Sequence, residues 1–103
     1  MKEITSKLYK RADKEMTEDY ETALLVLEQA TSTESRKTLK LMTLGEFEGT
    51  YDMAVGAYLE LIYEIHNETA EDEKEYYKFC EDLRKRQHEL EELLRNYCKR
   101  YSI

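Results

Sequence analysis

The feature that most constrains this chain is a regular spacing that runs through its last third. Eight residues there are separated by alternating steps of four and three: Tyr76, Cys80, Leu83, Gln87, Leu90, Leu94, Tyr97 and Tyr101. In an α-helix, this alternation places all eight side chains on one stripe, as in the seam of a coiled coil or helical bundle. The stripe therefore predicts a long helix that lies lengthwise against other helices.

Few residues interrupt helix in the rest of the chain. Proline is absent, and the three glycines all fall between positions 45 and 56. We expect helices over about residues 3–29, 34–66 and 70–101, because small or polar residues break the pattern between these ranges. The predicted fold class is all-α: an antiparallel, up-down-up bundle of about three long helices that forms one domain over residues 1–103.

Capping residues and charge support this arrangement. Thr31 with Glu34 matches a capping box before the second helix, and Thr69 with Asp72 can cap the third. Residues before position 15 carry five Lys/Arg against two acids, whereas those from 41 to 75 carry ten acids and one lysine. In an up-down-up bundle, the basic start of the first helix lies beside the acidic end of the second, so each neutralises the other.

The middle helix carries a stripe of small residues. Its members are Gly45, Gly49, Asp52 and Gly56. Each glycine costs a helix interior roughly 1 kcal/mol relative to alanine, so three of them need a reason. One reason is a smooth groove against which another helix or a partner packs closely. The other, which we favour, is a kink or break near residues 43–49, where Thr43 with Glu46 matches a further capping box.

Tyrosine gives the best indication of function. The chain has nine tyrosines and no tryptophan, and tyrosine is enriched at protein interfaces. Gln87, the polar member of the stripe, either fixes register and oligomeric state in a homodimer or lies at an exposed end of the seam, where water satisfies it. The candidate protein-interaction residues are Tyr76, Tyr77, Gln87, Tyr97 and Tyr101, together with Gly45, Gly49, Asp52 and Gly56.

Acidic side chains form a second candidate surface. It comprises Glu46, Glu48, Glu60, Glu64, Glu68, Glu71 and Asp72. The net charge of −7 argues against direct binding of nucleic acid or of an acidic membrane. We expect a non-enzymatic regulator or inhibitor that binds a protein partner and self-associates through the Tyr/Leu stripe. The acidic block is similar to the surface of phage anti-restriction and anti-CRISPR proteins that cover a nucleic-acid-binding site on their partner.

Carboxylate spacing supplies an enzymatic alternative. Glu15-x-x-Glu18 resembles the first half of the metal-binding motif of the all-α nucleotide pyrophosphohydrolases, which implies a metal-dependent phosphohydrolase. The second half is incomplete, because Glu48 and Asp52 are four residues apart rather than three. No histidine forms the Glu-x-x-His element of a di-iron bundle, and no base is placed to activate either cysteine. We therefore expect no enzymatic activity, no catalytic residue, no metal site and no cofactor.

A second alternative is a small secreted helical hairpin. Phe47-Glu48-Gly49, near the middle of the chain, resembles the Trp-x-Gly turn of that family, with Phe in place of Trp. Tyr77 with Glu81 is similar to its Tyr-x-x-x-Asp/Glu export signal. The resemblance implies a single hairpin that turns at residues 47–49.

Composition and cysteine placement favour the cytoplasm. The chain has no run of about 18 apolar residues, and its start lacks the apolar core of a signal peptide. Within one helix, Cys80 and Cys98 lie about 27 Å apart, too far for the approach of about 7 Å that a disulfide needs. Free thiols suit a reducing compartment. We expect a cytoplasmic protein with no membrane contact.

Overall fold

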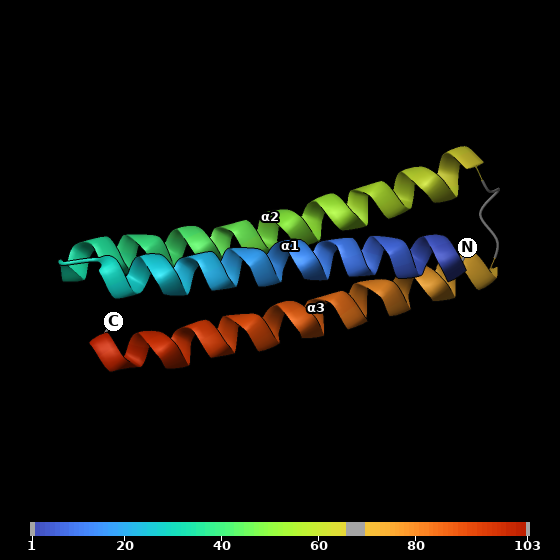
Figure 1. Cartoon of the computed structure of the whole chain (residues 1–103). Coiled ribbons are helices and arrows are strands. Elements are labelled where there is room, and N and C mark those ends of the chain that lie inside the picture. Colours follow the sequence, from blue (N-terminus) through green and yellow to red (C-terminus); the bar gives the residue numbers. More distant parts are fainter. Residues whose placement is uncertain (1, 66–69, 103) are drawn as a thin grey trace.

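The computed structural model describes residues 2–65 and 70–102. Three long helices follow one another, α1 (Lys2–Gln29), α2 (Thr33–Ile65) and α3 (Ala70–Cys98), and the 3-10 helix η1 (Lys99–Tyr101) extends the last of them. The helices run antiparallel along a rod of 53 × 18 × 18 Å, and each packs against the other two (Figure 1). The predicted all-α, up-down-up bundle is thereby confirmed.

The core lies along the axis of the rod and draws on all three helices. Its buried apolar residues are Ala12, Met16, Ala23 and Leu27 from α1, Phe47, Tyr58 and Ile62 from α2, and Phe79, Leu83, Leu90, Leu94 and Cys98 from α3. They recur at steps of four, seven or eleven, so each helix turns one continuous side inward. Full burial of a leucine or phenylalanine side chain contributes about 1.5–3 kcal/mol, which explains why these stripes set the packing.

The expected kink or break near residues 43–49 does not separate two helices, because α2 is one α-helix from Thr33 to Ile65. Thr43 is buried, and its hydroxyl donates to the carbonyl oxygen of Leu39 at 2.9 Å instead of capping a new helix. Phe47 and Tyr58 are fully buried on the inward side of the glycine segment. Their packing offsets the low helix propensity of the glycines.

The turn between α1 and α2 is closed by side chains other than the expected capping box. The Ser32 hydroxyl, not that of Thr31, accepts the backbone N–H of Ser35 at 3.1 Å, so Ser32 caps α2. Arg36 Nη2 donates to the carbonyl oxygen of Ala30 at 2.7 Å. The predicted cap of α3 involves Thr69, which lies outside the described residues.

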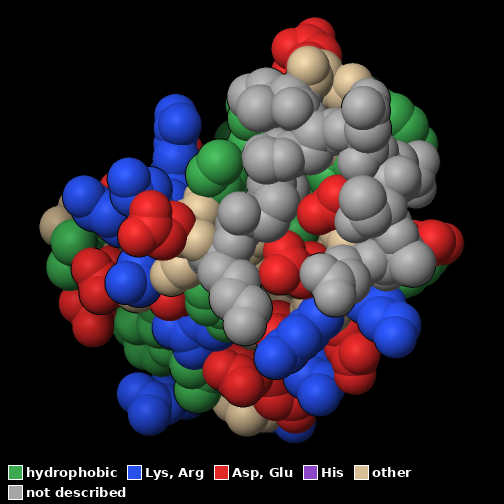
Figure 2. All heavy atoms as spheres, turned by 90° about the vertical axis from the view of Figure 1, so that its right-hand side faces the viewer, with side chains coloured by type: hydrophobic (Ala, Val, Ile, Leu, Met, Phe, Trp, Pro, Cys, Tyr) green, Lys and Arg blue, Asp and Glu red, His purple; other side chains and the backbone are tan. Residues whose placement is uncertain are grey.

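Opposite charges mix at the end of the bundle where α1 begins, as Figure 2 shows. The described bases at this end do not pair with the α2 acids within 4 Å; Lys14 contacts Glu18 of its own helix at 4.0 Å. The ion pair between α1 and α3 lies farther along the rod, where Arg86 Nε donates to Asp13 at 2.6 Å. At this end of the bundle, basic and acidic side chains are therefore intermixed on the surface, and the described α1 bases and α2 acids form no direct ion pairs.

Candidate functional site

The outer side of α2, opposite the core, is not covered by any described part of the chain. Gly45, Gly49 and Gly56 are exposed, and a Cβ atom added at any of them would meet no atom within 4 Å. Asp52 is exposed beside them. No described helix therefore packs on the smooth surface that the glycines create. Helix packing among the described residues does not explain why glycines occur there despite their low helix propensity.

Large apolar side chains stand exposed along the same side of α2. Met42 is 58% exposed and Met53 is 77% exposed, and Leu41 and Tyr63 are exposed to a similar degree. Isolated exposed apolar residues are ordinary, whereas these four lie on one helix beside the unfilled glycine positions.

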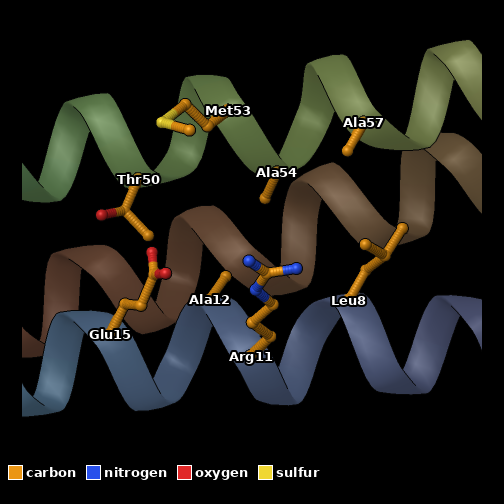
Figure 3. A pocket seen from close by; sticks show the side chains of 8 residues that line it. All are labelled: Leu8, Arg11, Ala12, Glu15, Thr50, Met53, Ala54 and Ala57. Atoms are coloured by element: carbon orange, nitrogen blue, oxygen red, sulfur yellow. The ribbon is translucent and has the colours of Figure 1, made fainter.

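A groove separates α1 from α2, and its first hollow lies near the middle of α2 (Figure 3). This hollow has a volume of about 140 Å³. The side chains at its floor are small, because Ala12, Ala54 and Ala57 face it. Arg11 projects from α1 into the opening, and Met53 lies at the α2 edge.

A second hollow lies in the same groove near the α1–α2 turn. It has a volume of about 450 Å³ and combines apolar and hydroxyl side chains. It is lined by Val26, Glu34, Ser35, Thr38, Leu39 and Met42. Val26 is nearly half exposed, so the apolar lining is open to solvent from the α1 side as well.

Carboxylates fill the stretch between the two hollows. The pKa of Asp19 is raised above its ordinary value of 3.8, first by partial burial and then by the negative charges of Glu46, Glu15 and Glu18. Acids from α1 and α2 therefore lie close enough to repel one another. Lys14, at the edge of this stretch, is 4.0 Å from Glu18.

We call the whole surface the α1/α2 face. It consists of the apolar Val26, Met42 and Met53, the acidic Asp19 and Glu46, and the exposed Gly49. Sequence reasoning found the glycines and Glu46 but missed the α1 half of the surface. The signal was present, because residues 15–30 and residues 41–65 contain no Lys or Arg, and an antiparallel pair of helices brings parts of these ranges together.

Gln87 occupies a different place from the exposed seam end considered above, since its side chain is fully buried. Its amide Nε2 donates to Glu48 at 2.7 Å and to Glu91 at 2.9 Å, and its Oε1 accepts from Arg84 Nη1 at 2.8 Å. Arg84 also donates to Glu48 at 2.7 Å and stacks over the Tyr51 ring at 3.6 Å. Every one of these partners belongs to the same chain, so the cluster fixes how α3 sits on α2.

The predicted interaction tyrosines separate into inward and outward groups. Tyr76 packs against Tyr58 with ring centroids 5.8 Å apart, and burial is the largest cause that raises the pKa of Tyr76 to about 12. Tyr97 donates to Glu28 at 3.2 Å, and Tyr101 lies under the Arg36 guanidinium at 4.3 Å. Of the tyrosines predicted for interaction, Tyr77 remains largely exposed, at 62%.

The predicted acidic surface is also divided. Glu46, Glu60 and Glu64 are exposed on α2. Glu48 accepts hydrogen bonds from Arg84 and Gln87. Asp72 was predicted to be on the acidic surface, but it is buried, with 9% of its surface exposed. Glu68 and the side chain of Glu71 lie outside the described residues.

The resemblances to other families fall on positions that the fold uses differently. Phe47, Glu48 and Gly49 lie inside α2, so they form no turn, and this corrects the single-hairpin expectation. Among the described residues, no three His, Cys, Asp or Glu side chains gather where they could hold a metal ion. Within the same part of the chain, no helix combines the length and apolar character needed to cross a membrane.

No known family model matches this chain, and neither a curated protein sequence nor a solved structure does.

Proposed function

We propose that this protein is a non-enzymatic, cytoplasmic binding module that recognises a protein partner through its α1/α2 face. The observation that carries the proposal is the row of exposed glycines on α2, where an added Cβ meets nothing within 4 Å. A helix carries residues of low propensity at a stability cost, and an uncovered row of them is explained by a partner that needs close approach. Met42 and Met53, exposed on the same helix, supply adaptable apolar contacts.

Within this class, we favour a regulator or inhibitor that blocks a positively charged site on its partner. Glu46, Glu60 and Glu64 point to this subclass, because they are exposed and no base occurs between positions 41 and 65. Such a surface suits an inhibitor that covers a nucleic-acid-binding site, as expected for a phage or mobile-element anti-defence protein.

Self-association as a homodimer is a separate proposal, and the α3 stripe does not support it as the dimer interface. Leu83, Leu90 and Leu94 of that stripe are buried against α1 and α2 of the same chain. A second copy therefore has to use another surface, and the α1/α2 face is the exposed apolar alternative.

The test is affinity purification of the tagged protein from cells of its source organism, comparing wild type with Gly49→Leu. A Cβ added at Gly49 meets no atom within 4 Å, so the leucine is expected to extend into solvent without disturbing the fold, and it would stand in the path of a partner that lies on α2. A protein recovered in stoichiometric amount with wild type and lost with Gly49→Leu supports the proposal.

Asn96→Leu is the matched control. Asn96 is exposed on α3, so the substitution adds the same apolar side chain without touching the α1/α2 face. A partner that is lost equally with both variants, or retained equally with both, contradicts the assignment of the surface.

A further inference from the structure

The α1/α2 groove presents its chemistry in a fixed order along its length. Val26 and Met42 supply apolar lining to the hollow near the turn, and Met53 edges the hollow in the middle of α2. The acids Asp19 and Glu46 lie between them. The order is therefore apolar, acidic, apolar, and an occupant that fits must repeat it with the charge reversed.

The spacing selects a helix as the occupant. Met42 and Met53 are eleven residues apart on α2, which corresponds to about 16 Å along the helix axis. Two anchors about three turns apart on a partner helix span the same length, and a groove between two antiparallel helices is the usual seat for a third helix laid along them. The glycine row leaves room for that helix to approach the α2 backbone.

Charge selects the sign of the segment between the anchors. Asp19 and Glu46 already repel each other, so a cation placed between them reduces this repulsion and is itself attracted to both carboxylates. Arg11 and Glu15 both line the other hollow, beside Met53, so their opposite charges offset each other there. The uncompensated negative charge lies near Asp19 and Glu46, and the positive charge of the occupant therefore belongs near these two acids.

We propose that the α1/α2 face binds an amphipathic helix of a partner protein that carries two apolar anchors about three turns apart with Lys or Arg between them, and so completes a four-helix bundle. The proposal rests on the proposed function and names the partner's chemistry. A second copy of this chain is the competing occupant and is an outcome of the test below.

The probe is a synthetic peptide of roughly 20 residues with two leucine anchors about eleven residues apart and lysines between them on the same face. The comparison peptide is identical except that glutamates replace these lysines. Binding to the full chain is measured by calorimetry at low and at physiological salt, and the site is located from backbone amide shifts. The lysine peptide is expected to bind, to weaken as salt rises, and to shift residues that line the two hollows.

Charge-removing variants distinguish this surface from the general acidity of the protein. Asp19→Asn with Glu46→Gln is expected to weaken the lysine peptide by roughly 2- to 30-fold, the effect of losing two surface charge pairs. Glu81→Gln with Glu92→Gln removes the same charge from exposed positions on α3 and is expected to leave the affinity unchanged. Asp19→Asn removes a repelled carboxylate, so the test variant is not expected to unfold.

Several results overturn the inference. Equal binding of both peptides, binding of neither, amide shifts that map to α3, or equal losses in the two variant pairs each remove the charged groove as the site. A concentration-dependent dimer of the protein alone, with amide shifts on the same face, makes a second copy the occupant. If Gly49→Leu still abolishes capture of a cellular partner while the peptides do not bind, the proposed function stands and the helical partner chemistry fails.

Discussion

The stripe of α3 and the outer side of α2 follow the same helical spacing, but within residues 2–65 and 70–102 only the first is covered by other helices. Leu83, Leu90 and Leu94 are buried against the other two helices, and the polar Gln87 among them is satisfied by partners in the same chain. On α2, Gly45 and Gly49 recur just as regularly and face solvent. Periodicity therefore identifies a surface that packs lengthwise, while residue size indicates whether the chain itself supplies the partner.

The difference has a physical origin. A stripe of large apolar side chains gains free energy from any neighbour that removes water, so the chain buries it as soon as it folds. A glycine row gains little from burial by side chains and permits close approach of another backbone. Such a row remains uncovered when no helix of the same chain comes close to it.

The largest expected effect separates the two sides of α2 itself. Phe47→Ala is expected to lower the free energy of unfolding by about 3–5 kcal/mol, because Phe47 is fully buried in the core. Met53→Ala, on the exposed side of the same helix, is expected to change it by no more than about 0.5 kcal/mol. Urea denaturation followed by circular dichroism measures both. Similar losses for the two variants would show that the outer side is packed in solution.

The next effect tests whether the Gln87 cluster acts within one chain. Gln87→Leu is expected to destabilise the monomer by about 1–2 kcal/mol, because it removes buried hydrogen bonds to Glu48, Glu91 and Arg84. The oligomeric state in light scattering should not change, since all three partners lie in the same chain. A change of oligomeric state in Gln87→Leu would instead show that Gln87 sets the register between two chains.

Glycine substitution reverses the sign of the usual mutational effect. Gly49→Ala is expected to raise the free energy of unfolding by about 1 kcal/mol, because the new methyl group meets nothing within 4 Å and alanine is the better helix former. Thermal denaturation of the single variant, and of the triple variant with Gly45→Ala and Gly56→Ala, measures the gain. A loss of stability would mean that the added methyl groups are not tolerated on this side of α2.

The smallest effect concerns the pH dependence of stability. Hydrogen bonds from Gln87 and then Arg84 hold the pKa of Glu48 below its ordinary value of 4.5. Because the folded-state pKa is the lower one, this contribution to stability is complete above pH 4.5 and is lost as the pH falls through the lowered value. Denaturation midpoints at pH 3 to 6 are expected to fall less steeply in Glu48→Gln than in wild type. Parallel curves would show that Glu48 is not engaged.

The sequence was sufficient for the fold because its signals agree. Absent proline, regular apolar stripes and breaks near residues 30–33 and 66–69 all indicate three helices, and the structure has them. The break considered at residues 43–49, where local capping chemistry favours a new helix start, is absent, because α2 is continuous from Thr33 to Ile65. Burial of Phe47 outweighs that local preference, and a burial partner on another helix is not visible from the neighbouring residues.

The candidate site could be predicted only in part. Gly49 and Glu46 belong to a single helix, so their pattern is visible along the chain. Asp19 and Val26 join them through the antiparallel contact of α1 with α2, and which side chains meet across that contact depends on register. For a related reason the sequence does not tell which tyrosines contact their own chain, as Tyr76 does with Tyr58 and Tyr97 does with Glu28.

The glycine row also governs where water can reach the backbone of a long helix. Helices ordinarily open from their ends, but glycine leaves the backbone more exposed to water, and a Cβ added at Gly45, Gly49 or Gly56 would meet no described atom within 4 Å. Hydrogen–deuterium exchange is therefore expected to show a fast-exchanging segment in the middle of α2, between slower flanks that carry Thr43 and Tyr58 toward the core. Protection of that segment would report the arrival of a binding partner without any label on either molecule.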